Sequence, residues 1–171
     1  MNFMELAKDR YSVRNFAEKA IENEKLEKIL EAGQIAPTAG NYQPQKVYVV
    51  QSEKGLEKLR SLTKCHYGAP TVLIIAYDRS KDWNNPNEDG VHSGEQDASI
   101  VATHMMLEAW ELGIGSCWVN FFSPTLVAKE FNFPEDIRPV LMLPIGYAKE
   151  DAKPAAWHEQ SKELSELVEY R

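Results

Sequence analysis

One long stretch with recurring hydrophobic positions, residues 93–118, organises the rest of this chain. Ser93, followed three residues later by Gln96, is typical of a capping box at a helix start, and Gly113 is typical of a helix end. The apolar residues between them occupy more than one stripe of a helical surface, which predicts a helix buried on more than one side. Such a helix has about 19 residues and is roughly 28 Å long. Charged side chains interrupt the run, so it does not fit a membrane span.

The rest of the pattern predicts helices and a few buried strands around this central helix. Asn23 is a good N-cap for a second helix, which Pro37 ends. Apolar residues at helical spacing, or in short continuous runs, predict the other elements. The predicted helices lie at residues 2–8, 53–62, 123–131 and 159–170, and the predicted strands at residues 46–51, 71–77, 117–119 and 140–147.

The order of these elements favours the α+β class, with a central sheet flanked by helices, because strands and helices do not alternate regularly. No GxGxxG turn follows a predicted strand, which argues against a Rossmann site. The polar loop at residues 78–92 is long for a compact protein, and we expect it to be a mobile cover over a site. Residues 1–171 are enough for a single domain with one core.

Composition and charge narrow the class of function. Hydrophobic residues make up 43% of the chain, an ordinary globular value. The net charge of -7 and the lack of a dense Lys/Arg run argue against nucleic acid or an acidic membrane as partner. Cys65 and Cys117 form no CxxC motif, so we expect free thiols in a reducing compartment and no metal site. Residues 1–10 lack the apolar segment of a signal peptide, so we expect a cytoplasmic location.

Arg10, Ser12 and Arg14 form the first candidate site. In an extended segment alternate side chains share a face, so two guanidinium groups and a hydroxyl would point the same way. Such a set can cradle a phosphate dianion through forked, charge-assisted hydrogen bonds. The alternative is that these are surface arginines paired with acids such as Asp9 or Glu18.

Two further segments carry small and amide side chains suited to a ligand. Residues 38–40 allow close backbone approach, and Asn41 and Gln43 offer amide groups against which a flat polar ring could lie. Residues 113–120 could bring backbone N–H groups up to a ligand. The alternatives are a helix-terminating turn in the first case and, in the second, a tight turn that buries Trp118 in the core.

Four segments together resemble the nitroreductase family of FMN-dependent oxidoreductases. They are RYSVRNF, APTAGNYQP, LGIGSCWVN and LMLPIGY, in that family's order and with compatible spacing. The resemblance extends over nearly the whole chain. It implies the nitroreductase-like α+β fold and an intertwined obligate homodimer with two FMN sites at the subunit interface, which the central helix helps to form.

The resemblance also implies which residues of this chain meet the cofactor. They are Arg10, Ser12 and Arg14 at the FMN phosphate and ribityl chain, Pro37, Thr38, Ala39 and Asn41 on the loop that reaches the flavin from the partner subunit, and Trp118, Val119, Asn120 and Phe121 along the ring near N5, which a backbone N–H typically approaches.

The implied activity is a ping-pong reaction. NAD(P)H gives a hydride to flavin N5 and leaves, and an electron-poor acceptor such as a nitroaromatic or a quinone then takes the electrons at the same face. The cofactor supplies this chemistry, and no residue of the chain stands out as a catalytic acid or base. Lys64 is a candidate for a donor that stabilises the reduced flavin.

Two departures from the family pattern leave alternatives open. Ser161 stands where many members have a basic residue that reaches the FMN phosphate, and Lys162 is a candidate to compensate for it. The insertion that covers the flavin ring in longer members is absent. The same fold could therefore serve reductive dehalogenation, enone reduction, or flavin storage or sensing without turnover. If the resemblance is fortuitous, a flavin-free interaction domain remains.

Overall fold

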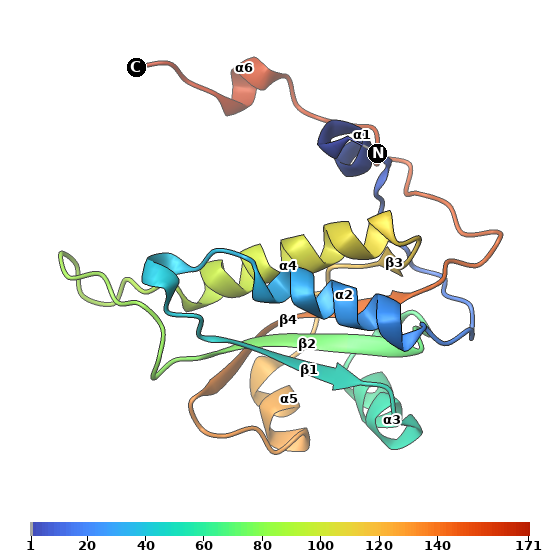
Figure 1. Ribbon diagram of the computed structural model, residues 1–171, viewed down its shortest axis with the longest axis horizontal. Coiled ribbons are helices and arrows are strands. Elements are labelled where there is room, and N and C mark those ends of the chain that lie inside the picture. Colours follow the sequence, from blue (N-terminus) through green and yellow to red (C-terminus); the bar gives the residue numbers. More distant parts are fainter. Residues whose placement is uncertain (1) are drawn as a thin grey trace.

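The computed structural model describes residues 2–171, which form an antiparallel four-stranded sheet with helices on both faces (Figure 1). The strands lie in the order β1-β2-β4-β3, and each neighbouring pair is antiparallel. The predicted α+β class is therefore confirmed. The strands are β1 Gln45–Val50, β2 Thr71–Asp78, β3 Gly115–Ser116 and β4 Ile137–Gly146. The helices are α1 Phe3–Asp9, α2 Asn23–Gln34, α3 Glu53–Leu62, α4 Gly94–Glu111, α5 Pro124–Glu130 and α6 Leu164–Leu167, with 3-10 turns η1 Ala39–Asn41 and η2 Lys64–His66.

Strand β2 is the centre of the core, because every one of its residues is buried. Side chains of a strand alternate between its two faces, so β2 contributes to two hydrophobic clusters. Leu73 and Ile75 pack with α2 and α4, whereas Val72 and Ile74 pack with α3 and α5. Figure 1 shows the resulting layers, with α2 and α4 above the sheet and α3 and α5 below it.

Helix α4 is the long central helix that the sequence predicts. One face, which includes Val101 and Met105, is fully buried against the sheet and α2. Gly33 of α2 permits this packing, since a Cβ there would lie 2.8 Å from the Met105 side chain. The opposite face is less covered, with Trp110 half-buried and Ile100 37% exposed. The expected burial of this helix on more than one side is therefore only partly observed in the single chain.

Local signals explain where three helices begin. The Ser52 hydroxyl accepts the Gly55 N–H at the start of α3, which spans the predicted residues 53–62. The Ser123 hydroxyl accepts the N–H of Leu126 at the start of α5, and Pro124 occupies the first helical position. At α1, the side chains of Asn2 and Glu5 form a complete capping box.

Two predicted helix caps are wrong. Ser93 precedes α4 but does not cap it, because its hydroxyl donates to Asp97 at 2.6 Å instead. Asn23 is already the first residue of α2, and Glu22 before it is the N-cap without a side-chain hydrogen bond. Both helices form although their predicted caps are wrong. Their formation therefore depends more on the apolar periodicity than on the residue at the cap.

The short strand after α4 begins earlier than predicted. β3 pairs with the end of β4 at residues 115–116, whereas the prediction was 117–119. Pro144 of β4 accepts the N–H of Cys117 but has no N–H to return. The regular pairing therefore stops after Ser116, and Val119 rejoins β4 only as an isolated bridge with Met142.

The C-terminal helix is much shorter than predicted. Only the single turn α6 forms within residues 159–170, and every residue of that range is exposed. A short helix without a packed face is not stable in water, which explains the difference. Figure 1 shows the segment running past α1 and away from the sheet. In the described residues 2–171, no helix has the length and apolar character needed to cross a membrane.

Candidate functional site

The first candidate region lies near the C-terminal end of α4, where an extended segment follows α1. The Val13 N–H donates to the Ser116 carbonyl at 2.9 Å, and Ser12 forms a parallel bridge with Ser116. Val13 itself is fully buried, so the residues on either side of it turn outwards. Arg10, Ser12 and Arg14 then line one groove of about 200 Å³, as the alternation predicts.

The two arginines of this groove, Arg10 and Arg14, form no ion pair with a carboxylate in the described part of the chain. Asp9, the nearest acid in the sequence, accepts the indole N–H of Trp110 at 2.9 Å. Arg14 donates to the backbone carbonyl of Ser12 at 3.3 Å. The alternative in which both arginines pair with neighbouring acids is therefore not observed.

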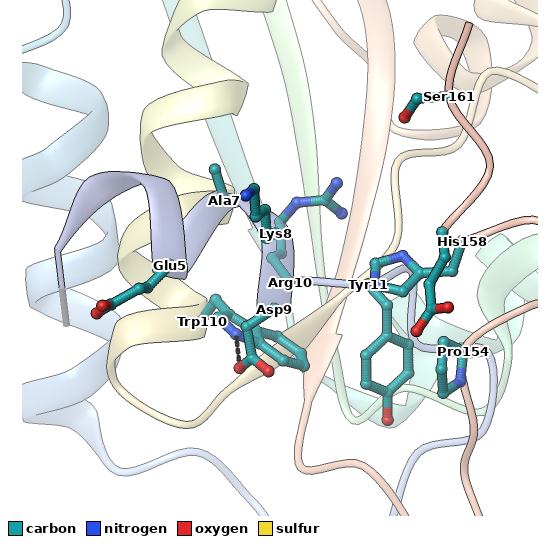
Figure 2. A pocket seen from close by; sticks show the side chains of 11 residues that line it. Glu5, Ala7, Lys8, Asp9, Arg10, Tyr11, Trp110, Pro154, His158 and Ser161 are labelled. Atoms are coloured by element: carbon teal, nitrogen blue, oxygen red, sulfur yellow. Dashed lines mark hydrogen bonds between the residues drawn. The ribbon is translucent and has the colours of Figure 1, made fainter.

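The C-terminal segment forms another wall of this groove through Trp157 and His158. The Tyr11 hydroxyl donates to the Ala152 carbonyl at 3.5 Å, which ties the segment to the body of the protein. The Tyr11 ring also meets the His158 ring edge-on, with 6.1 Å between centroids. A larger groove of about 1020 Å³ adjoins the first and shares Arg10, Tyr11 and His158 with it (Figure 2).

Lys162, the candidate to compensate for Ser161, does not complete this groove. Ser161 lines the larger groove but not the smaller one, and Lys162 lines neither. Lys64, the candidate donor to the reduced flavin, lies outside both grooves as well. His158 is the basic side chain that lies with the two arginines, although no motif marks it and it is far from them in the sequence. Within residues 2–171, no set of three or more His, Cys, Asp or Glu side chains could hold a metal ion.

Cys117 lies close behind the arginine segment but is poorly suited to a reactive role. Burial raises the pKa of its thiol, although the Arg14 charge acts in the opposite direction. Burial, with a hydrogen bond to Cys65, raises the pKa of the nearby Tyr67 phenol to about 12. Both groups are therefore protonated at neutral pH, and the interpretation of Cys117 as a structural thiol is favoured.

The second candidate region is the loop of residues 37–43, at the other end of α4. The Ala39 N–H donates to the Asp97 carboxylate at 2.8 Å, which fastens the loop to the first turn of α4. Within the loop the Thr38 hydroxyl accepts the Gln43 N–H at 3.1 Å. The Asn41 side-chain oxygen accepts the Gln43 amide at 2.9 Å. The loop thus has a defined shape that its own side chains maintain.

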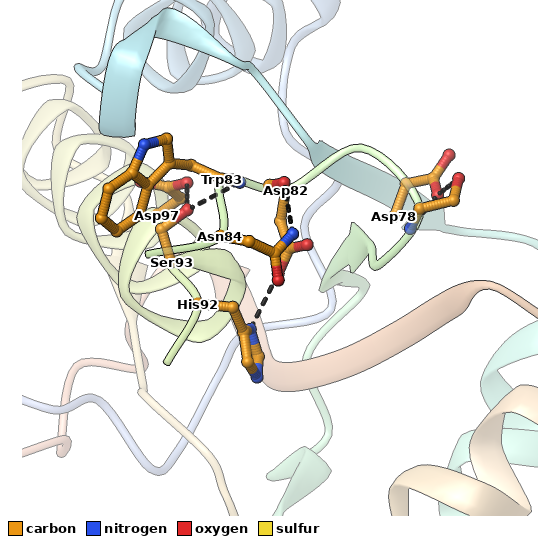
Figure 3. Close-up of polar contacts among 8 residues, drawn as sticks. Asp78, Asp82, Trp83, Asn84, His92, Ser93 and Asp97 are labelled. Carbon is orange, nitrogen blue, oxygen red and sulfur yellow. Dashed lines mark hydrogen bonds and ion pairs between the residues drawn. The ribbon is translucent and has the colours of Figure 1, made fainter. Parts of the chain in front are cut away.

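Asp97 also connects this loop to the neighbouring segment of residues 79–92 (Figure 3). Its second carboxylate oxygen accepts the Ser93 hydroxyl at 2.6 Å, and that hydroxyl accepts the Trp83 N–H at 3.3 Å. Asp97 is 2% exposed and stands in the first turn of α4, where the helix dipole favours negative charge. The buried Asp97 carboxylate therefore connects three parts of the chain, which are the loop at residues 37–43, the segment of residues 79–92 and the first turn of α4.

The loop at residues 78–92, expected to be a mobile cover, is tied back on itself after Asp78, which belongs to β2. The His92 Nδ1 lies 2.8 Å from the buried Asp82 carboxylate, and Asn84 and His92 form an antiparallel bridge. Trp83 lies beside Gly40 of the adjacent loop. The segment lines neither of the grooves around Arg10.

The third predicted segment, Trp118 to Asn120, lies against the middle of β4. Val119 exchanges both backbone hydrogen bonds with Met142 at 2.9 Å. The Trp118 indole N–H donates to the Asn120 side-chain oxygen, and the Asn120 amide donates to the Val140 carbonyl at 3.1 Å. Trp118 is half-buried against the core cluster around α4, so the interpretation as a core residue is partly correct.

A single chain does not bring the predicted cofactor residues together. Asp97 anchors the loop at residues 37–43, and Trp110 lies beside the arginine segment. The two residues are separated by roughly 20 Å along the axis of α4. Two groups therefore form at opposite ends of one helix. They are Arg10, Ser12 and Arg14 at the C-terminal end, and Pro37, Thr38, Ala39 and Asn41 at the N-terminal end.

Known proteins share this architecture. The structure of a nitroreductase family protein from Clostridium difficile 630 is 43% identical, with a TM-score of 0.93 over 99% of this chain and 98% of that chain. An FMN-dependent nitroreductase from Clostridium difficile R20291 is 27% identical, with a TM-score of 0.78 over 98% of each chain. An NADPH-dependent oxidoreductase from Staphylococcus aureus strain USA300 is 27% identical over 88% of this chain and 66% of the relative.

The fold and these relatives define an α+β enzyme of the oxidoreductase class. The sequence profile of the Nitroreductase family matches residues 7–67 and 63–147. The chain therefore belongs to the nitroreductase family, as its four motifs predict. The matched region contains the arginine segment, the loop at residues 37–43 and Trp118 to Asn120, but it ends before the C-terminal segment that carries His158.

Proposed function

We propose that this nitroreductase-type enzyme uses FMN to transfer electrons from NAD(P)H to an electron-poor acceptor, such as a nitroaromatic or a quinone. When bound, FMN would supply the chemistry by taking a hydride from NAD(P)H and passing electrons to the acceptor in a separate, ping-pong step. One observation carries the proposal. Arg10 and Arg14 share a groove with the Ser12 hydroxyl, and no carboxylate in residues 2–171 forms an ion pair with either arginine.

The groove suits the phosphate end of FMN. Guanidinium groups give planar, forked hydrogen bonds to phosphate oxygens, and the Ser12 hydroxyl can donate a further one. A volume of about 200 Å³ accommodates a phosphate group but not a whole flavin. The ring must therefore lie outside the groove. We propose that it meets Trp118, Val119 and Asn120 of the same subunit.

A homodimer would complete this site. In a two-fold dimer with antiparallel α4 helices, the N-terminal end of one α4 lies beside the C-terminal end of the other. Residues 37–43 of the partner would then approach the arginine groove, and two equivalent sites would form. Exposed apolar side chains support such an interface, because a monomer would leave Phe3 66% and Ile35 79% exposed to water.

The test is an absorption spectrum of the purified protein, recorded after FMN is added and the excess removed. We expect flavin bands that bleach with NAD(P)H and return when a nitroaromatic or quinone is added. Bands that persist with NAD(P)H would indicate flavin storage or sensing instead. Turnover with a halogenated or enone acceptor but no nitroaromatic or quinone would change the proposed reaction. A protein that retains no FMN would contradict the proposal as a whole.

Light scattering tests the dimer separately. We expect a mass of about twice the 19.5 kDa of one chain. A monodisperse monomer that still holds flavin would contradict the composite site, while leaving the arginine groove as a phosphate site intact.

A further inference from the structure

A short turn before β2 carries a tyrosine in an unfavourable backbone conformation. Tyr67 has a φ of 53° and a ψ of 22°, in the left-handed region that suits glycine and strains a residue with a bulky side chain. Within residues 2–171, the other non-glycine residues with a positive φ are Asn41, Gln43 and Asn132, which all carry amide side chains. Strain of this kind persists only where the surrounding structure holds it, and it is typical of functional positions.

Hydrogen bonds on both sides of Tyr67 hold this turn in place. Before it, the Thr63 hydroxyl accepts the N–H of Cys65 at 3.1 Å. After it, the Gly68 N–H donates to the His66 Nδ1 at 2.9 Å. The turn therefore keeps the left-handed residue in a fixed position, with its side chain half-buried in the protein.

The Tyr67 side chain meets the segment that carries Arg14. Its ring packs against the hydrophobic cluster that contains Val13 and Cys117. The Tyr67 hydroxyl makes a polar contact with the Arg14 guanidinium. It also contacts the thiols of Cys65 and Cys117. Three segments that are far apart in the sequence therefore meet at one phenol.

The protonation state of the phenol fixes the direction of these contacts. Burial raises the pKa of Tyr67 to about 12, so the phenol is neutral at pH 7. A guanidinium has N–H donors and no acceptor, so the Tyr67 oxygen accepts a hydrogen bond from Arg14. The phenol hydrogen then points to a thiol sulfur, which is a weak acceptor.

Two neutral acceptors thus hold the Arg14 guanidinium. The second is the Ser12 carbonyl, which accepts from Arg14 at 3.3 Å. A carboxylate in the place of the Tyr67 hydroxyl would also orient the guanidinium, but it would offset the positive charge that an anionic ligand needs. An arginine with no anchor would sample many rotamers and lose that freedom on binding. A phenol orients the side chain and leaves its charge available.

We infer that Tyr67 is a positioning residue, which orients the Arg14 guanidinium in the groove that Arg14 lines with Arg10 and Ser12. The inference rests on the proposed function, since the anion that Arg14 would bind is the phosphate of FMN. Tyr67 does not line this groove itself. It would therefore act through Arg14 and not by contact with the ligand.

The test compares FMN with riboflavin, which is the same flavin without the phosphate. Dissociation constants are measured by flavin fluorescence for the wild type, Tyr67→Phe and the matched control Tyr48→Phe. The control removes a phenol hydroxyl from the same hydrophobic cluster, on a ring that stacks on Phe133 and does not line the groove. We expect Tyr67→Phe to weaken FMN binding about fivefold and riboflavin binding less than about twofold. The control should change neither constant by more than about twofold.

A double-mutant cycle with Arg14 supplies a second measurement. If Tyr67 acts through Arg14, Tyr67→Phe should change FMN affinity less than about twofold once Arg14→Ala is present. The full fivefold loss in that background would overturn the inference, because Tyr67 would then act by another route.

Two further outcomes would also overturn the inference and leave the proposed function standing. One is an FMN affinity that Tyr67→Phe does not change. The other is an equal loss for FMN and riboflavin, which a merely structural role of the turn would give. Failure of the wild type to bind FMN at all would overturn both the inference and the proposed function.

Discussion

The two ends of α4 use polar side chains in opposite ways. At the N-terminal end, Asp97 and Ser93 are buried and bonded to the loop at residues 37–43 and to Trp83. At the C-terminal end, Arg10 and Arg14 border an open groove and have no acidic partner within residues 2–171. The hydrogen bonds of Asp97 and Ser93 fix the backbone of the loop before any ligand binds. The positive charges of Arg10 and Arg14 stay available to bind a ligand.

This difference separates stability from binding. A buried carboxylate that satisfies several donors is costly to remove, because the donors lose their partner and stay in the interior. A partly exposed guanidinium with no ion pair contributes little to folding. Substitutions at the two ends should therefore change different measured quantities, the free energy of unfolding at the N-terminal end of α4 and the affinity for FMN at the C-terminal end.

The largest effect is expected at Asp97. Asp97→Ala leaves the Ala39 N–H and the Ser93 hydroxyl without an acceptor, so it should lower the free energy of unfolding by about 3 kcal/mol. Glu95→Ala is the matched control in the same turn, because its side chain is exposed, and should cost about 0.5 kcal/mol or less. Urea denaturation of both variants measures this. Equal losses would remove the distinction between the two ends.

Arg14 should show the reverse behaviour. Arg14→Ala should weaken FMN binding by about tenfold to a hundredfold, because a charge-assisted pair of hydrogen bonds is lost. The free energy of unfolding without FMN should change by about 0.5 kcal/mol or less. Fluorescence titration and urea denaturation give the two values. A protein destabilised as strongly as Asp97→Ala would mean that Arg14 supports the fold instead.

The smallest effect is expected in a hydrogen-bond network near the C-terminal end of α4. This network resembles the one around Asp97 but is exposed. Lys25 donates to the Leu112 carbonyl at 3.0 Å and to the Tyr147 hydroxyl at 2.9 Å, and that hydroxyl donates to Glu22 at 2.6 Å. The hydrogen bond from Tyr147 is the main cause that lowers the pKa of Glu22 from 4.5 to about 2.

The sign of the pH dependence follows from this lowered pKa. The ionised Glu22 stabilises the folded protein above about pH 4.5, and the contribution is lost as pH falls towards 2. In Tyr147→Phe the pKa of Glu22 should move back towards its ordinary value, so stability should fall less steeply over that interval. Denaturation midpoints at pH 3, 4 and 6 measure the slopes. Parallel slopes would show that the hydrogen bond does not control this carboxylate.

The elements that the sequence predicts well are those with a packed apolar face. Residues 53–62 and 71–77 have such faces, and both elements form within one residue of the prediction. The predicted helix over residues 159–170 has helix-forming composition but no surface to pack on, so only α6 forms. Ser93 has the right spacing for a cap, but a tertiary partner takes its hydroxyl.

The residues of the candidate site also fall into two groups, those that a local sequence pattern predicts and those that only the tertiary fold brings together. Alternation along one extended segment is local, so Arg10, Ser12 and Arg14 could be grouped from the sequence. His158 joins them only because the chain returns past Tyr11 much later, and no local pattern encodes that return. The separation of residues 37–41 from the arginines also depends on how α4 packs against the rest of the fold. The apolar periodicity of the sequence does not specify this packing.

The length of α4 has a consequence for how this chain can change by insertion and deletion. Asp97 and Trp110 each need a particular partner, the loop at residues 37–43 for one and Asp9 for the other. One residue added between them would turn one end of the helix by about 100° relative to the other and lengthen it by about 1.5 Å. Either Asp97 or Trp110 would then face away from its partner. We expect length variants to be tolerated in residues 79–92 and in the C-terminal segment, and to be eliminated inside α4.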